Sequence, residues 1–152
     1  MSIKELDRVI MNKMKLLGEP AARISLFVIF FWFGILKPLG VSAAAPLVIE
    51  TVDWMPLLSA EQWLSVIGWW EVIIGICFLF QKTTRIAILL LFLQMTGTFM
   101  PLFILPEITF QENGIPFLPT LEGQYIVKNI IIISAALVIG GNLESKRTGH
   151  KI

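Results

Sequence analysis

Residues 21–37 read AARISLFVIFFWFGILK, and the thirteen positions between Arg23 and Lys37 carry no charge. A helix needs about 20 mostly apolar residues to cross a bilayer, because each residue adds about 1.5 Å against about 30 Å of hydrocarbon. The stretch reaches that length if it continues to about residue 41. We therefore expect a membrane-spanning helix over about residues 21–41.

Three further stretches have the same character. They cover about residues 63–80, 86–105 and 125–141. The whole chain of 152 residues is 56% hydrophobic and only 15% charged, whereas a soluble domain has about 25% charged residues. Residues 81–85 are too few for anything but a turn, and short connections favour antiparallel neighbours. The predicted fold class is all-α, an integral membrane four-helix bundle.

The remaining segments flank or connect these spans. Residues 1–20 have apolar residues at helical spacing among basic ones, which predicts an amphipathic cytoplasmic segment on the anionic inner leaflet. Residues 42–62 and 106–124 are expected as outer loops, and residues 142–152 as a basic tail. The small residues 42–45 after the first span imitate a signal-peptide cleavage site. The long basic region and Lys37 argue instead for a retained span.

Lysine and arginine predict the orientation of the bundle. Ten of them fall on one side of the predicted spans: Lys4, Arg8, Lys13, Lys15, Arg23, Lys82, Arg85, Lys146, Arg147 and Lys151. The opposite connections carry acidic residues instead. Cytoplasmic loops are enriched in basic residues, so both termini are expected in the cytoplasm. The net charge of only +1 gives no reason to expect a nucleic-acid partner.

Three charges lie within the predicted spans, where ionisable groups usually face the bundle interior. Lys37 is 14 residues beyond Arg23, about 21 Å along the helix, and Lys128 is about 20 Å from Gly141. Glu71 lies about 14 Å from the inner end of its span, roughly one turn below both lysines. The depths therefore predict a cluster in which Lys37 and Lys128 flank Glu71.

The facing of these residues supports the same cluster. Gly68, Glu71 and Gly75 are spaced i, i+3, i+7, and small residues mark the faces where membrane helices approach closely. Gln94, on the third span, falls near the level of Glu71 and can donate a hydrogen bond to the carboxylate. Trp70, beside Glu71, is a candidate wall for a pocket that takes a flat ring.

Three interpretations of the cluster stay open at this point. The charges could neutralise one another and fix the packing of the helices. The surplus positive charge could instead receive an anionic or quinone-like oxygen from the outer face. Both lysines could also extend to the outer surface. Arg23, at the start of the first span, is expected to be an anchor at the inner interface.

Other residue types limit the chemistry. The single cysteine, Cys77, cannot close an intramolecular disulfide, and the single histidine, His150, lies in the polar tail. No group of metal ligands and no catalytic residue is therefore predicted, and no cofactor motif is present. We expect no independent catalysis.

Several short motifs together resemble the DoxX-like superfamily of small four-helix membrane proteins, including its YkgB-like branch. They are FWFGILK ending at Lys37, APLV at residues 45–48, IGWWEVIIG around Glu71, and PTLEGQYIVKN with Tyr125 and Lys128. The resemblance covers about residues 21–141. Lys37-Pro38 departs from the bulky or aromatic residue expected after that lysine, which affects the shape of the outer loop.

The resemblance implies a multi-pass protein of the bacterial inner membrane with a role in redox or oxidative stress. A bound quinone is then the expected ligand, at Lys37, Glu71, Gln94, Lys128, Trp70 and Tyr125. A membrane or redox protein, or further copies of the chain, are the expected partners besides the lipid bilayer. The alternatives are a structural subunit of a larger membrane complex and an oligomeric transporter of small solutes. Against transport, the inner halves of the spans are almost wholly apolar.

Overall fold

The computed structural model describes residues 2–148 of the chain, and the side chains as far as residue 143. Four helical stretches in this part are long and apolar enough to cross a membrane: Ile3–Leu36, Ala60–Leu79, Gln81–Ile104 and Leu121–Leu143. The predicted all-α class is thus confirmed for the described residues, and the chain is a multi-pass membrane protein. His150 and Lys151 lie outside the described residues, as do the side chains of Lys146 and Arg147.

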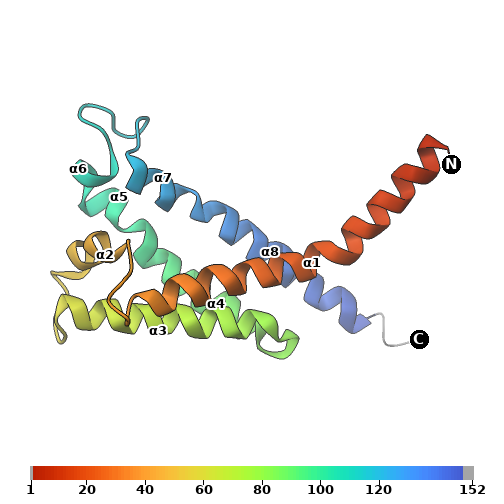
Figure 1. Ribbon diagram of the computed structural model, residues 1–152, viewed down its shortest axis with the longest axis horizontal. Helices are drawn as coiled ribbons and strands as arrows, with labels where there is room; N and C mark the ends of the chain where they lie inside the picture. The colour runs from red at the N-terminus through yellow and green to blue at the C-terminus, as the bar shows by residue number, and fades with distance from the viewer. Residues whose placement is uncertain (1, 149–152) are drawn as a thin grey trace.

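The first helix, α1 (Ile3–Leu36), is longer than the predicted span. Its 34 residues correspond to about 51 Å, well beyond the hydrocarbon thickness of a bilayer. Ser2 caps its first turn by accepting from the backbone N–H of Glu5. The helix continues through Pro20 without interruption, and its N-terminal half projects away from the other helices (Figure 1). The segment expected as a separate amphipathic piece is therefore the beginning of the first spanning helix.

The second and third spans form an antiparallel hairpin. Helix α3 (Ala60–Leu79) begins with a capping box between Ser59 and Gln62, and a short 3-10 turn, η1 (Gln81–Thr83), leads into α4 (Thr84–Phe99). The span is extended by α5 (Pro101–Ile104). Proline has no N–H to continue the helical ladder, which accounts for the division at Pro101.

The fourth span is also divided. Helix α7 (Leu121–Val127) ends at Lys128, and α8 (Asn129–Thr148) continues the path. The Asn129 side-chain amide donates to the carbonyls of Tyr125 and Ile126 at 3.0 Å, at the point where the two helices meet. An asparagine that bonds to nearby backbone offers the chain an alternative to the helical ladder.

The two ends of the molecule differ in structure. Short helices α2 (Ala45–Val52) and α6 (Pro106–Thr109) lie together with α5 and α7 at one end (Figure 1). The basic turn between α3 and α4, the N-terminal half of α1 and the last turns of α8 lie toward the other (Figure 1). The core between the long helices is apolar and consists of Leu26, Phe30, Ile74, Phe78, Ala87, Leu91, Met95, Ala136 and Ile139.

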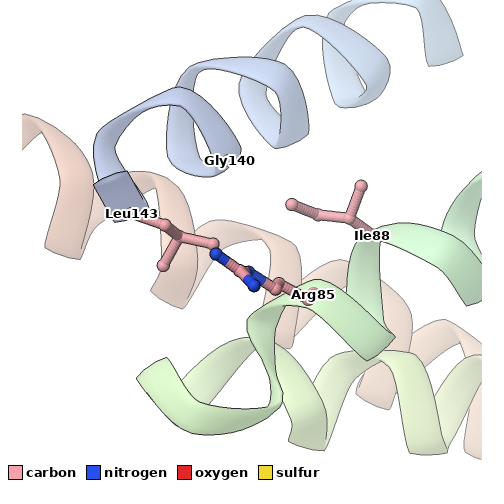
Figure 2. A pocket seen from close by; sticks show the side chains of 4 residues that line it. All are labelled: Arg85, Ile88, Gly140 and Leu143. Carbon is pink, nitrogen blue, oxygen red and sulfur yellow. The ribbon is translucent and has the colours of Figure 1, made fainter. Parts of the chain in front are cut away.

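A cleft of about 320 Å³ opens between the beginning of α4 and the end of α8. Its lining residues are Arg85 and Ile88 from α4, with Gly140 and Leu143 from α8. Figure 2 shows the Arg85 side chain extending from α4 toward Leu143. Among the described side chains, the lining of this cleft therefore combines one cation with apolar walls.

Candidate functional site

Lys37, Glu71 and Gln94 meet within the bundle, one from each of the first three spans. The Lys37 ammonium donates to Oε2 of Glu71 and forms an ion pair with it. The Gln94 side-chain amide donates to the other carboxylate oxygen, Oε1, at 3.1 Å. Each oxygen of the carboxylate therefore has one donor. We call this group the Lys37–Glu71–Gln94 site.

Two glycines bring the charged residues together. A Cβ atom on Gly34 would lie 2.9 Å from Cβ of Glu71, and one on Gly68 would lie 2.8 Å from Cβ of Lys37. Each helix thus places a glycine opposite the charged residue of its neighbour. Both glycines also lie three positions before the charge on their own helix, which is about one turn. The antiparallel pair α1 and α3 therefore has a reciprocal contact, and its close approach requires the absence of side chains at both glycines.

The site is largely, but not completely, buried. The Lys37 side chain is 6% exposed and the Glu71 side chain 14% exposed. An ammonium has three N–H groups, and among the described residues that of Lys37 has one acceptor. Two of its N–H groups therefore remain for an oxygen atom of a ligand or of water. Each carboxylate oxygen of Glu71 can likewise accept more than one hydrogen bond.

Trp70 and Trp69 take different positions beside Glu71. The indole N–H of Trp70 donates to the carbonyl of Leu90 at 3.2 Å, which ties α3 to α4 one turn before Gln94. Trp69 is 53% exposed and faces outward. Buried indoles usually find an acceptor for their N–H, and Trp70 follows this rule. That hydrogen bond holds its ring at the contact between α3 and α4, against the apolar core.

Lys128 and Tyr125 are not part of this site. Lys128 is exposed, and its ammonium lies 5.1 Å from the centre of the Tyr125 ring in a cation–π contact. Tyr125 itself is 62% exposed. The expectation that Lys128 flanks Glu71 therefore does not hold. Its exposed side chain matches the alternative in which the lysine extends to the surface. Depth along a span does not tell which way a side chain faces, and Lys128 lies at the break between α7 and α8.

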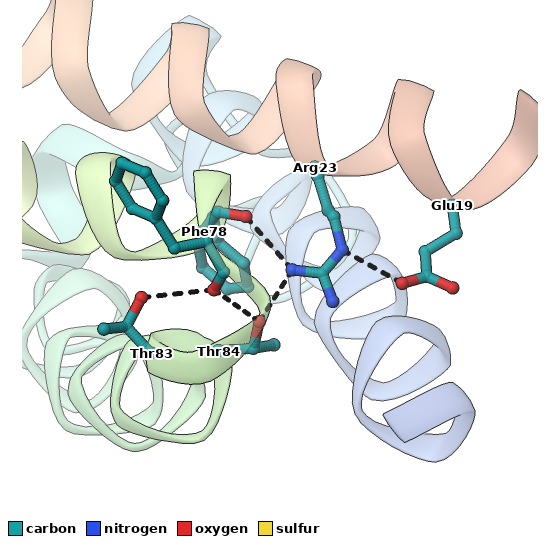
Figure 3. A network of polar contacts seen from close by, with 6 residues as sticks. Glu19, Arg23, Phe78, Thr83 and Thr84 are labelled. Carbon is teal, nitrogen blue, oxygen red and sulfur yellow. Dashed lines mark hydrogen bonds and ion pairs between the residues drawn. The ribbon is translucent and has the colours of Figure 1, made fainter. Parts of the chain in front are cut away.

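A second polar cluster surrounds Arg23, the predicted anchor at the inner interface. The Arg23 side chain is only 8% exposed and pairs with Glu19 at 3.0 Å. Its Nη1 atom donates to the Phe78 carbonyl at 3.1 Å and to the Thr84 hydroxyl at 2.6 Å (Figure 3). The Phe78 carbonyl belongs to the last turn of α3, where carbonyls lack partners within the helix. Arg23 therefore joins α1 to the turn between α3 and α4.

The pairing of Arg23 with Glu19 has a signal in the sequence. Glu19 and Arg23 are spaced i, i+4, which places an acid and a base side by side on a helix. The partners across the bundle, Phe78 and Thr84, have no such signal, because one contributes a backbone carbonyl and the other a common hydroxyl.

The comparisons with known proteins give no match: no family model, no curated protein and no solved structure is similar to this chain. Within the described residues, no three histidine, cysteine or acidic side chains gather as they would around a metal ion. The candidate site therefore rests on the geometry of Lys37, Glu71 and Gln94.

Proposed function

We propose that this multi-pass membrane protein binds a quinone-like or anionic small molecule at the Lys37–Glu71–Gln94 site, as a component of the response to redox stress. One observation carries the proposal: a lysine and a glutamate from different spans pair inside the bundle while both keep hydrogen-bonding capacity. Ionisable groups inside a membrane protein usually mark a ligand or ion pathway. The motifs around Lys37 and Glu71 support membership of the DoxX-like superfamily, where redox work at the membrane is the common theme.

The donors and acceptors of the site match the polar groups of a quinone. The free N–H groups of Lys37 suit a quinone carbonyl or an anionic oxygen, and the carboxylate of Glu71 suits the hydroxyl of a hydroquinone. Gln94 has a second amide N–H beyond the one donated to Glu71. A bound quinone would supply the redox chemistry, and the residues of this chain would hold and orient it.

Ligand binding can be tested by thermal stability. We expect ubiquinone or menaquinone analogues to raise the melting temperature of the purified protein, because a ligand that binds only the folded state stabilises it. Gln94→Leu, which removes a donor at the edge of the site, should reduce the shift. Lys128→Met removes an exposed lysine outside the site and should leave it unchanged. Equal shifts in both variants, or none in the parent protein, would count against the proposal.

A structural role for the same residues has a separate observation in its favour. The reciprocal contacts of Gly34 with Glu71 and of Gly68 with Lys37 place the ion pair at a close approach of α1 and α3. A buried pair in such a position can specify the register of two helices. The variant Lys37→Met/Glu71→Met separates the two roles. A protein that stays folded but no longer responds to quinones favours ligand binding, and a misfolded one favours structure.

We also propose that both termini are cytoplasmic. The basic turn between α3 and α4 and the basic N-terminal half of α1 lie toward the same end of the molecule, and such residues concentrate on the cytoplasmic side. The chain has one cysteine, Cys77, so a Cys77→Ser background allows single-cysteine labelling. An impermeant maleimide added to intact cells should label Glu112→Cys and not Lys82→Cys. The reverse pattern would invert the topology.

A further inference from the structure

Arg85 gives the cleft between α4 and α8 a charge that pairs with none of the acids whose side chains the structure describes. Among the described residues, the ion pairs are Arg23 with Glu19 and Lys37 with Glu71, and Arg85 has none. Arg85 is exposed on the first turn of α4, where the partial positive charge of the helix end adds to its own. An anion is therefore the complement that the cleft lacks.

The other lining residues that the structure describes are apolar. Ile88 lies one turn further along α4 and is half-buried, while Leu143 and Gly140 come from α8. A Cβ atom on Gly140 would meet the end of the Ile88 side chain at 3.0 Å, so the glycine keeps this part of the cleft open. Along α4, the Arg85 cation is followed by apolar side chains. This order matches a molecule with an anionic head and a hydrocarbon body.

The position of the cleft within the bundle selects one kind of molecule. Arg85 follows the short turn that connects two spanning helices, so it lies at the boundary between hydrocarbon and water, where phospholipid phosphates are found. The volume of about 320 Å³ is near the lower end of the range for small-molecule sites. It suits a phosphate with its glycerol and the first part of the acyl chains, with the rest of the chains lying outside along the helices.

We propose that this cleft binds one anionic phospholipid of the cytoplasmic leaflet. Arg85 contacts its phosphate, and Ile88 and Leu143 contact the first part of its acyl chains. The bound lipid would bridge α4 and α8 at the end of the molecule opposite to α2 and α6. The proposal is independent of the ligand at the Lys37–Glu71–Gln94 site, because the two sites share no residue.

Native mass spectrometry of the full chain can test this with phosphatidylglycerol as the probe. The parent protein should retain one phosphatidylglycerol more tightly than phosphatidylcholine. Arg85→Gln should weaken that binding at least about fivefold, the change that corresponds to losing about one cation near a membrane surface. Lys82→Gln is the matched control, since Lys82 is an exposed cation on the adjacent turn that does not line the cleft. It should retain binding within about twofold.

Two further arms distinguish the cleft from general charge attraction. Gly140→Leu fills the cleft without changing charge and should also abolish retention of the tightly bound lipid. Inorganic phosphate should not displace the lipid, because it lacks the acyl chains. Any one of four results would overturn the proposal. Binding could fall equally in Arg85→Gln and Lys82→Gln, or stay unchanged in Gly140→Leu. Phosphate could displace the lipid, or the protein could retain phosphatidylcholine equally well.

Discussion

The strongest energetic prediction concerns the pairing of Lys37 with Glu71. The two side chains are 6% and 14% exposed, so removing either one leaves a charge in the bundle with little access to water. Glu71 would then retain only the hydrogen bond from Gln94. Breaking a buried ion pair in this way costs about 3–5 kcal/mol, whereas replacing both partners with apolar side chains of similar volume is often neutral.

A double-mutant cycle measures this dependence. We expect Lys37→Met and Glu71→Met each to lower the free energy of unfolding by about 3 kcal/mol, and the double variant to lie within about 2 kcal/mol of the parent protein. The coupling energy should therefore exceed about 2 kcal/mol. Lys128→Met, which removes an exposed lysine with a cation–π contact, should cost about 1 kcal/mol or less.

The assay is unfolding in mixed micelles, with helix content followed by circular dichroism. Ordinary interhelical hydrogen bonds in membrane proteins give coupling energies of about 0.6 kcal/mol on average. A value near that figure for Lys37 and Glu71 would refute the reasoning, because it would mean that water or lipid headgroups reach both charges. A loss as large in Lys128→Met would refute it as well.

Two more predictions use the same measurement. Gly68→Val should destabilise the protein by about 1–3 kcal/mol through overpacking against Lys37. Gly97→Val is the control and should not destabilise it, because no atom lies within 4 Å of a Cβ at that position. Equal effects of the two substitutions would contradict the close approach of α1 and α3. Thr84→Val should cost about 1–3 kcal/mol because Arg23 loses an acceptor within the bundle. Thr96→Val is the control, because the Thr96 hydroxyl is exposed and bonds only to its own helix. It should change stability by less than about 0.5 kcal/mol. A similar loss at both threonines would contradict the structural role of Arg23.

Hydropathy was sufficient to predict the helical class and the approximate positions of the spans. A bilayer imposes both the length and the apolar character of a spanning helix, so this information is local and lies in the sequence. The facing of Glu71 was also readable, because Gly68 and Gly75 mark the contact face of α3. Gln94 followed from its depth.

The position of Lys128 was not readable in the same way. Its depth does not tell which way its side chain faces, and it lies at the break between α7 and α8, where the Asn129 side chain bonds to neighbouring carbonyls. The level of Arg23 was readable, because the start of a span suggests an interface and its partners flank the turn between α3 and α4. The partners themselves, the Phe78 carbonyl and the Thr84 hydroxyl, were not. Contacts between distant segments through backbone atoms leave no pattern in the sequence.

A quinone should bind at the Lys37–Glu71–Gln94 site. Photolabelling with an azidoquinone, followed by mass spectrometry of the peptides, tests this directly. We expect the label on the segments around Gly34–Lys37, Gly68–Glu71 and Gln94, with competition by unlabelled quinone. Label concentrated at Arg85 and Leu143, or spread over the lipid-facing helices without competition, would contradict the claim.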